Sequence, residues 1–414
     1  MLIALISAIN TRIVRNYHQV GPLDGTNYGY CDFHNGIYWP AVAIKDQVSP
    51  YGQEYAEKYP VDRATPIFMP STFLLHAPFG WIDLKTGEAI YFAIMIGLVS
   101  ALALVTLSAS GIQYSVGWCA AVMILIVTSR PGYGTLFSGY FTFELAVATV
   151  LALHWGNRPG WGGAMLAVAA CKPTYAIPLA IFMIARGHWR AVLVGVALAI
   201  LGSAIIYFWL LPDKSWSFLI EDIRYGQSQH MADRTEMPEF NWTRVDIVAV
   251  IAKWLKANPS EGVQVALFLV VCLVPAVIVW RLRKHPGSEN VSSLSGTISL
   301  LTMNALLYRH YYDLIVLVVP IVALAVGARQ VHREFSTWMR FVIAGLLLIA
   351  LFNYGSTLSF FGRFGIEQGS TEYLLLTSLS GCALFAALIL ALATGLKRIS
   401  QGHLLTVDSS SALP

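Results

Sequence analysis

Long apolar runs separated by short polar connections constrain this chain more than any other feature. Ten of these runs come close to the roughly 17 to 25 residues that a helix needs to cross a bilayer. They cover residues 88–108, 112–129, 135–155, 161–185, 191–211, 262–280, 291–307, 313–328, 338–353 and 373–396. The chain is 56% hydrophobic and only 12% charged, unlike a soluble domain. The sequence therefore predicts an all-α, polytopic integral membrane protein.

The positions of Lys and Arg predict the orientation, because cytoplasmic loops retain positive charge during insertion. These residues are about twice as dense in one set of connections as in the other. We assign the basic set to the cytoplasm: 83–87, 130–134, 186–190, 281–290, 329–340 and 397–414. The remaining connections are then outside: 10–66, 109–113, 156–160, 212–261, 308–312 and 356–371. This alternation makes the shorter run 67–82 a crossing despite Pro70 and Pro78, for about 11 transmembrane helices.

Residues 1–396 are expected to form one transmembrane domain with two large extracytoplasmic loops, 10–66 and 212–261. Short interfacial helices are expected at 37–48, 215–225 and 245–257, and a disordered cytoplasmic tail after Gln401. Residues 1–9 reach only about half of a ~30 Å hydrocarbon core. We therefore expect the chain to begin inside its first transmembrane helix.

Several classes of site lack sequence support. Four of the five cysteines lie in predicted spans and Cys31 stands alone outside, so neither a disulfide framework nor a zinc pattern is expected. We find no glycine-rich phosphate loop and no basic nucleic-acid stripe. The sequence therefore points to no cofactor, metal or nucleic-acid partner.

The first outer loop carries an acid among aromatic residues. Asp32 precedes the expected helix 37–48, where its carboxylate has two interpretations: an N-cap, or a general base that accepts a proton from a sugar hydroxyl. The neighbouring aromatic side chains suit an interfacial belt as well as sugar rings or isoprenoid chains. As candidate substrate-pocket residues we single out His34, Tyr38, Trp39 and Tyr51.

A second polar cluster lies at residues 308–313, at an expected outer membrane boundary. Snorkelling and belt behaviour explain an Arg and tyrosines there, but not His and Asp as well. We expect Arg309 and His310, together with Arg363 on the same face, to bind a lipid-linked phosphate. Tyr312 and Asp313 complete the candidate pocket.

Two ionisable residues lie about ten residues into their spans, where isolated charges are costly. The simplest interpretation of Glu144 and Lys172 is a mutual intramembrane ion pair, and the alternative is a polar pocket beneath the site. The second outer loop, 212–261, is either a lid of interfacial helices or an acceptor-binding element.

The order of several short motifs resembles glycosyltransferase family 87, polytopic enzymes of the GT-C fold class that use polyprenyl-phosphate-linked sugars. The motifs are Asp32-Phe33, Pro50-Tyr51-Gly52, Phe68-Met69-Pro70 with Pro78, the stretch 139–144, Lys172-Pro173, and the stretch 309–313 before Pro320. The resemblance covers roughly 32–320. It implies that an acid in the first extracytoplasmic loop acts as base, and Asp32 occupies that position.

The sequence thus predicts an inverting glycosyltransferase in the plasma membrane, with its catalytic face outside the cytoplasm. The resemblance to family 87 implies a polyprenyl-phosphate sugar as donor, with mannose favoured and a pentose next, and the expected acceptor is a lipid or glycan. Two alternatives remain open: a transporter or flippase of lipid-linked sugars, and a non-catalytic membrane subunit of the same fold.

Overall fold

The computed structural model describes residues 31–61, 68–212, 214–233, 236–285, 287–306, 308–327 and 334–410. The expected first-helix remnant 1–9 and residues 10–30 of the first loop lie outside these residues. Within the described part the secondary structure is helical, apart from one isolated antiparallel bridge between Arg244 and His310. The all-α prediction is confirmed.

Five helices are long and apolar enough to cross a membrane, or up to six if one bent pair is counted as a span. The five are α6 (Leu84–Ala109), α12 (Trp189–Leu210), α15 (Glu261–Leu282), α19 (Thr337–Phe352) and α21 (Thr371–Ser410). The bent pair is α7 (Val116–Thr128) and α8 (Arg130–Ser138), which meet at 73°. These helices make the chain a multi-pass membrane protein, although the predicted number of about 11 spans is not confirmed.

Several predicted spans are instead short helices. They are α9 (Thr142–His154), α10 (Pro159–Ala169), α11 (Pro173–Ala185), α16 (Leu294–Ala305) and α17 (Val318–Val326). None has more than 13 residues, so at ~1.5 Å per residue none exceeds about 20 Å, well short of a ~30 Å core.

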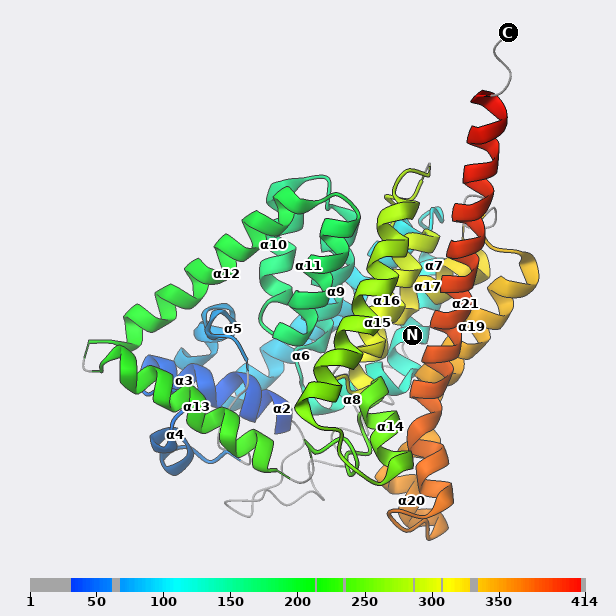
Figure 1. Ribbon diagram of the computed structural model, residues 1–414. Coiled ribbons are helices and arrows are strands. Elements are labelled where there is room, and N and C mark those ends of the chain that lie inside the picture. Colours follow the sequence, from blue (N-terminus) through cyan, green and yellow to red (C-terminus); the bar gives the residue numbers. More distant parts are fainter. Residues whose placement is uncertain are drawn as a thin grey trace.

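Helices α10 and α11 enter the bundle and turn back. Gly156, before α10, lies against His188, after α11: a Cβ on this glycine would be 2.3 Å from the imidazole ring. Both ends of the pair, α10 and α11 in Figure 1, are therefore on one face. Lys172 lies in the turn between the two helices. The prediction that 161–185 crosses the membrane was wrong, because its helix is interrupted just before Pro173.

Helices α16 and α17 also start and end on one face. The Leu294 amide donates to a Glu334 carboxylate oxygen at 2.6 Å, which joins the start of α16 to the segment after α17. On the same face, Arg186 donates to the Glu289 carbonyl. The segment between them, with the 3-10 turn η4 (Tyr311–Leu317), therefore lies deep in the molecule.

The run 67–82 does not cross the membrane either. It forms the short helix α5 (Pro70–His76) and the 3-10 turn η2 (Ala77–Trp81), which packs on α3 (Trp39–Lys45) of the first loop. A Cβ on Gly80 would be 2.4 Å from the Ala41 carbonyl oxygen, and the Tyr38 hydroxyl donates to the Ile82 carbonyl at 3.0 Å. The start of α6 thus shares the face of the first loop.

This result reverses part of the predicted alternation. Connections 83–87 and 130–134 lie on the face of the first loop, whereas 109–113 and 156–160 lie on the opposite face. Relative to the first loop, the predicted sides of these four connections were wrong. The predicted crossing at 67–82, which was inferred from their alternation, was wrong for the same reason.

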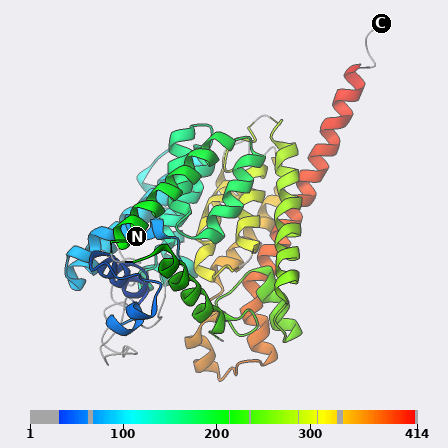
Figure 2. The same ribbon diagram turned by 60° about the vertical axis from the view of Figure 1, so that its left-hand side comes forward.

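The two large loops form helices on one end of the bundle (Figures 1 and 2). The first loop contains α2 (Cys31–Phe33), a π turn η1 (His34–Tyr38), α3, and α4 (Gln53–Lys58). The second contains α13 (Trp216–Ala232) and α14 (Ile247–Leu255), close to the expected ranges. The turn η5 (Tyr354–Ser356) and α20 (Leu358–Phe364) complete this end, which we call the site face.

The C-terminal helix α21 leaves the bundle at the opposite end (Figures 1 and 2). We expected a disordered tail after Gln401, but the helix continues to Ser410.

Candidate functional site

A cavity of about 1250 Å³ opens among the elements of the site face. Its wall combines segments far apart in the sequence: α2, α8, the turn before α11, the second loop, the segment before η4, and the region of α20. Ionisable residues on the wall include Asp32, Arg130, Lys172, Glu236, Glu239, Lys253, Lys256 and His310. A cavity of this size exceeds the roughly 300–1,000 Å³ typical of small-molecule sites, so it has room for more than one substrate group.

Asp32 lies on this wall, on the first turn of the helical segment that begins the described first loop. The next residue fixes it: Phe33 is fully buried and stacks on Tyr91 of α6, with ring centroids 5.1 Å apart. His34 adds a 2.6 Å contact from Nε2 to a Glu88 carboxylate oxygen on the same helix. Asp32 therefore lines the cavity from a backbone that its neighbours anchor on α6.

Lys172 reaches the cavity from the α10–α11 turn. Its ammonium group donates to both oxygens of Asp313, at 3.1 and 3.2 Å, and Asp313 is completely buried. The rings of Tyr140, Tyr175 and Tyr312 surround the ammonium group, with centroids 5.2–5.6 Å from Nζ. The cation is thus held in a fixed position on the cavity wall.

The predicted ion pair between Lys172 and Glu144 was wrong. Glu144 instead lies 3.0 Å from His76 Nε2 and accepts the Tyr91 hydroxyl at 2.9 Å. The two residues have similar predicted depths, but the turn at Lys172 directs its side chain toward Asp313 of η4. Asp313, predicted to be a pocket residue, is the partner of Lys172 and is not among the residues that line the cavity.

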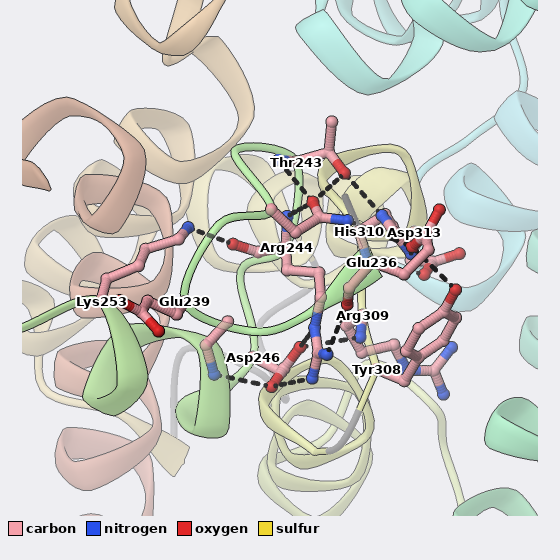
Figure 3. A network of polar contacts seen from close by, with 12 residues as sticks. Glu236, Glu239, Thr243, Arg244, Asp246, Lys253, Tyr308, Arg309, His310 and Asp313 are labelled. Atoms are coloured by element: carbon pink, nitrogen blue, oxygen red, sulfur yellow. Dashed lines mark hydrogen bonds and ion pairs between the residues drawn. The ribbon is translucent and has the colours of Figure 1, made fainter. Parts of the chain in front are cut away.

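His310 lines the cavity and is held on several sides (Figure 3). Its Nδ1 is 2.6 Å from the Thr243 hydroxyl, and its ring stacks on Tyr312 at 5.0 Å with an angle of 7°. The backbone around it pairs with the second loop, since the Tyr311 amide donates to the Thr243 carbonyl at 2.8 Å. Glu236 lies on the same wall, 4.0 Å from His310 Nε2. His310 and Tyr312 thus line the same cavity as Asp32, as the sequence predicted.

Arg309 points away from the cavity. Its guanidinium group lies 3.8 Å from the Tyr175 ring centroid and donates from Nε to the Met303 carbonyl at 2.9 Å. Its side chain is fully buried and is not part of the cavity wall. The expected contact between Arg309 and a phosphate is therefore not supported by this geometry: adjacent residues of an extended segment point in opposite directions.

An ion pair in the second loop supports this wall (Figure 3). Arg244 donates to both oxygens of the fully buried Asp246, at 2.9 and 3.0 Å. Asp246 also accepts the Ala249 amide, which caps α14, and the Arg309 amide. Asp246 therefore joins the second loop to the segment that presents His310.

Lys253 of α14 lies on the wall of the cavity behind this ion pair (Figure 3). Its Nζ donates to the Arg244 carbonyl at 3.0 Å. Burial lowers the pKa of Lys253 to about 7, although the nearby Asp246 carboxylate opposes this shift. This side chain is therefore a titratable group on the wall near neutral pH.

Five other predicted site residues lie outside the cavity wall. His34, Tyr38 and Tyr51 are buried in contacts with Glu88, the Ile82 carbonyl and the Phe68 carbonyl. Trp39 packs on Tyr38 and Tyr59, and Arg363 is exposed on α20. The aromatic residues of the first loop thus pack around α3 and do not line this cavity.

Three residues of the wall were not predicted from the sequence, namely Arg130, Tyr140 and Glu236. Arg130 was assigned to the opposite face. The local signal was the stretch Ser129-Arg130-Pro131-Gly132, which ends one helix and starts another.

Comparisons with known proteins gave one match. The model of glycosyltransferase family 87 matches residues 67–303, which is more than half of the chain. No match was found among curated proteins or among solved structures.

Proposed function

The chain belongs to glycosyltransferase family 87, and we propose that it transfers a sugar from a polyprenyl-phosphate donor to a hydroxyl group of a lipid or glycan acceptor. Mannose is the proposed sugar. We place the reaction in the cavity of the site face and propose residues 1–396 as one GT-C-type domain. The observation that carries the proposal is that one cavity is lined by a carboxylate, Asp32, by the Lys172 ammonium group and by the His310 imidazole.

The proposed reaction uses Asp32 as general base. The Asp32 carboxylate accepts the proton of the acceptor hydroxyl as that oxygen attacks the anomeric carbon of the donor. The bond between the anomeric carbon and the phosphate oxygen breaks, and the polyprenyl phosphate leaves with the bonding electron pair. Attack from the opposite side inverts the anomeric configuration.

The proposed role of Lys172 and His310 is to stabilise the leaving phosphate. Lys172 is held by Asp313, and His310 is held by Thr243, so neither group has to reorganise when negative charge develops. Tyr312 lies between them on the wall and suits contact with a sugar ring.

We propose that the site face lies outside the cytoplasm, at the plasma membrane. The opposite face carries short connections rich in Arg and Lys, namely 186–190, 281–290 and the segment from 397, as the positive-inside rule requires of a cytoplasmic face.

The test is sugar transfer by the purified protein in lipid nanodiscs, with radiolabelled polyprenyl-phosphate mannose and a mixed lipid acceptor fraction. Asp32→Asn is expected to lower the rate by about 10²–10⁴-fold, the typical contribution of a general base. The matched control is Asp46→Asn, the same substitution at an exposed position of the same loop. Equal rates for Asp32→Asn and the parent would contradict the assigned base. Donor translocation without formation of a new glycosidic bond would favour a transporter.

A further inference from the structure

Arg130 occupies a bend that the sequence builds with small residues. Ser129 accepts the Gly132 amide at 3.1 Å and so caps α8. A Cβ on Gly132 would lie 1.9 Å from the Ile126 carbonyl oxygen, and one on Gly134 would lie 2.5 Å from the Tyr311 hydroxyl. The bend thus brings α8 directly against Tyr311, with Arg130 at the start of the helix.

The guanidinium group of Arg130 lies against two aromatic rings of the cavity wall. Its central carbon is 4.0 Å from the ring centroid of Tyr311 and 5.5 Å from that of Trp242. These two rings are nearly parallel, at 22°. Arg130, Trp242 and Tyr311 all line the cavity.

Arg130 is buried without a counter-charge. Only 3% of its surface is exposed, and its two terminal nitrogens donate to the hydroxyl and the carbonyl of Ser356. In the described part of the chain no carboxylate pairs with it, and its Nε has no hydrogen-bond partner. Lys172 and Arg244 differ, since each donates to both oxygens of a buried carboxylate.

A buried charge without a partner costs several kcal/mol, so an anion that enters the cavity at this point gains the interaction that the protein leaves open. We propose that Arg130, Trp242 and Tyr311 form a subsite for the phosphate group of a polyprenyl-phosphate lipid. In this subsite the guanidinium group binds the phosphate, while the rings of Trp242 and Tyr311 pack against the guanidinium group. This inference rests on the proposed function, and it identifies a phosphate-binding residue on α8 in place of Arg309 and Arg363.

The test measures binding rather than transfer, so it can succeed even if the transfer reaction fails. Polyprenyl phosphate and the uncharged polyprenol are titrated into the protein in phosphatidylcholine nanodiscs, and bound lipid is quantified by native mass spectrometry. The parent is expected to bind the phosphate more tightly than the alcohol. Arg130→Gln is expected to weaken phosphate binding by about 10- to 100-fold, the value of a charge-assisted hydrogen bond, and to leave polyprenol binding unchanged. Arg158→Gln, at an exposed arginine of the opposite face, is the matched control.

Arg130→Lys separates binding from folding, because it keeps the charge and loses only the planar fork. It is expected to bind the phosphate with intermediate affinity. Equal affinities of the parent protein for polyprenyl phosphate and polyprenol would overturn the proposal. It would also be overturned if His310→Gln abolished the preference for polyprenyl phosphate while the Arg130 variants retained it. Displacement of polyprenyl phosphate by phosphatidylglycerol would make the ligand a phospholipid headgroup and would overturn the polyprenyl assignment.

Discussion

At the scale of single residues, the buried charges show which contacts the molecule depends on. Lys172 and Asp313 form a pair with almost no exposure to solvent, and removal of one partner of such a pair costs about 3 to 5 kcal/mol. We expect Lys172→Met and Asp313→Asn each to lower the melting temperature strongly, and the double variant to fall little further. Lys172→Met combined with Glu144→Gln should instead be additive. Melting temperatures of the five variants and the parent show whether Asp313 or Glu144 is the partner of Lys172. Additive effects of Lys172→Met and Asp313→Asn would contradict the pairing of Lys172 with Asp313.

Lys253 gives a pH-dependent prediction. Burial lowers its pKa from 10.5 to about 7, so between these values the unfolded chain binds a proton that the folded protein does not. Stability therefore rises with pH in this window and is unaffected below it. The melting temperature of the parent relative to Lys253→Met is expected to increase between pH 7 and 10 and to stay level below pH 7. A constant difference from pH 7 to 10 would show that Lys253 keeps its proton in the fold.

Individual site residues were predictable only in part. Asp32, His310 and Tyr312 were expected in one site, and all three line one cavity. Arg309 was expected there as well, but the pattern of residue types does not say which way each side chain of a non-helical segment points. Arg130 was missed because its sequence, next to a proline at the end of an apolar run, also fits an ordinary cytoplasmic loop.

At the scale of helices, the bend between α7 and α8 depends on glycine. A methyl group at Gly132 would overlap the Ile126 carbonyl, which belongs to the backbone and cannot move away cheaply. We expect Gly132→Ala to destabilise the protein by about 3 kcal/mol, the upper end of the usual cost of overpacking. Gly97→Ala on α6 has open space and should be neutral or up to about 1 kcal/mol stabilising. Thermal unfolding in detergent measures both, and equal melting temperatures would rule out the close approach at the bend.

Helices that turn back inside the membrane explain why the crossings were overcounted. The run 161–185 is apolar and long enough to span, and hydropathy alone cannot tell one span from two half-length helices that share a turn. The local signal was Lys172 directly before Pro173, a charge and a helix start in the middle of an apolar run. Such turns place polar backbone groups deep in the molecule, where these groups are tolerated because they line a cavity.

At the scale of the whole molecule, the corrected arrangement predicts which residues share a side of the membrane. Asn157 and Arg190 should lie on one side, and Lys58 and Lys85 on the other; all four are exposed. Single cysteines at these positions, in a variant without the five native cysteines, can be labelled with a membrane-impermeant maleimide in sealed vesicles. If the label reached Asn157→Cys and Lys58→Cys from the same side, these two positions would share a side, as the distribution of Lys and Arg predicted. That result would contradict the arrangement of α5, α10 and α11.

The whole molecule brings a carboxylate and cationic groups from distant segments into one cavity, and a bound ligand tests this account most directly. The measurement is a cryo-electron microscopy structure of the protein in nanodiscs with polyprenyl phosphate. The account predicts phosphate density inside the cavity that Asp32, Lys172 and His310 line, against the part of the wall that Arg130 forms. Phosphate density outside that cavity, with Asp32 and His310 far from the ligand, would contradict it.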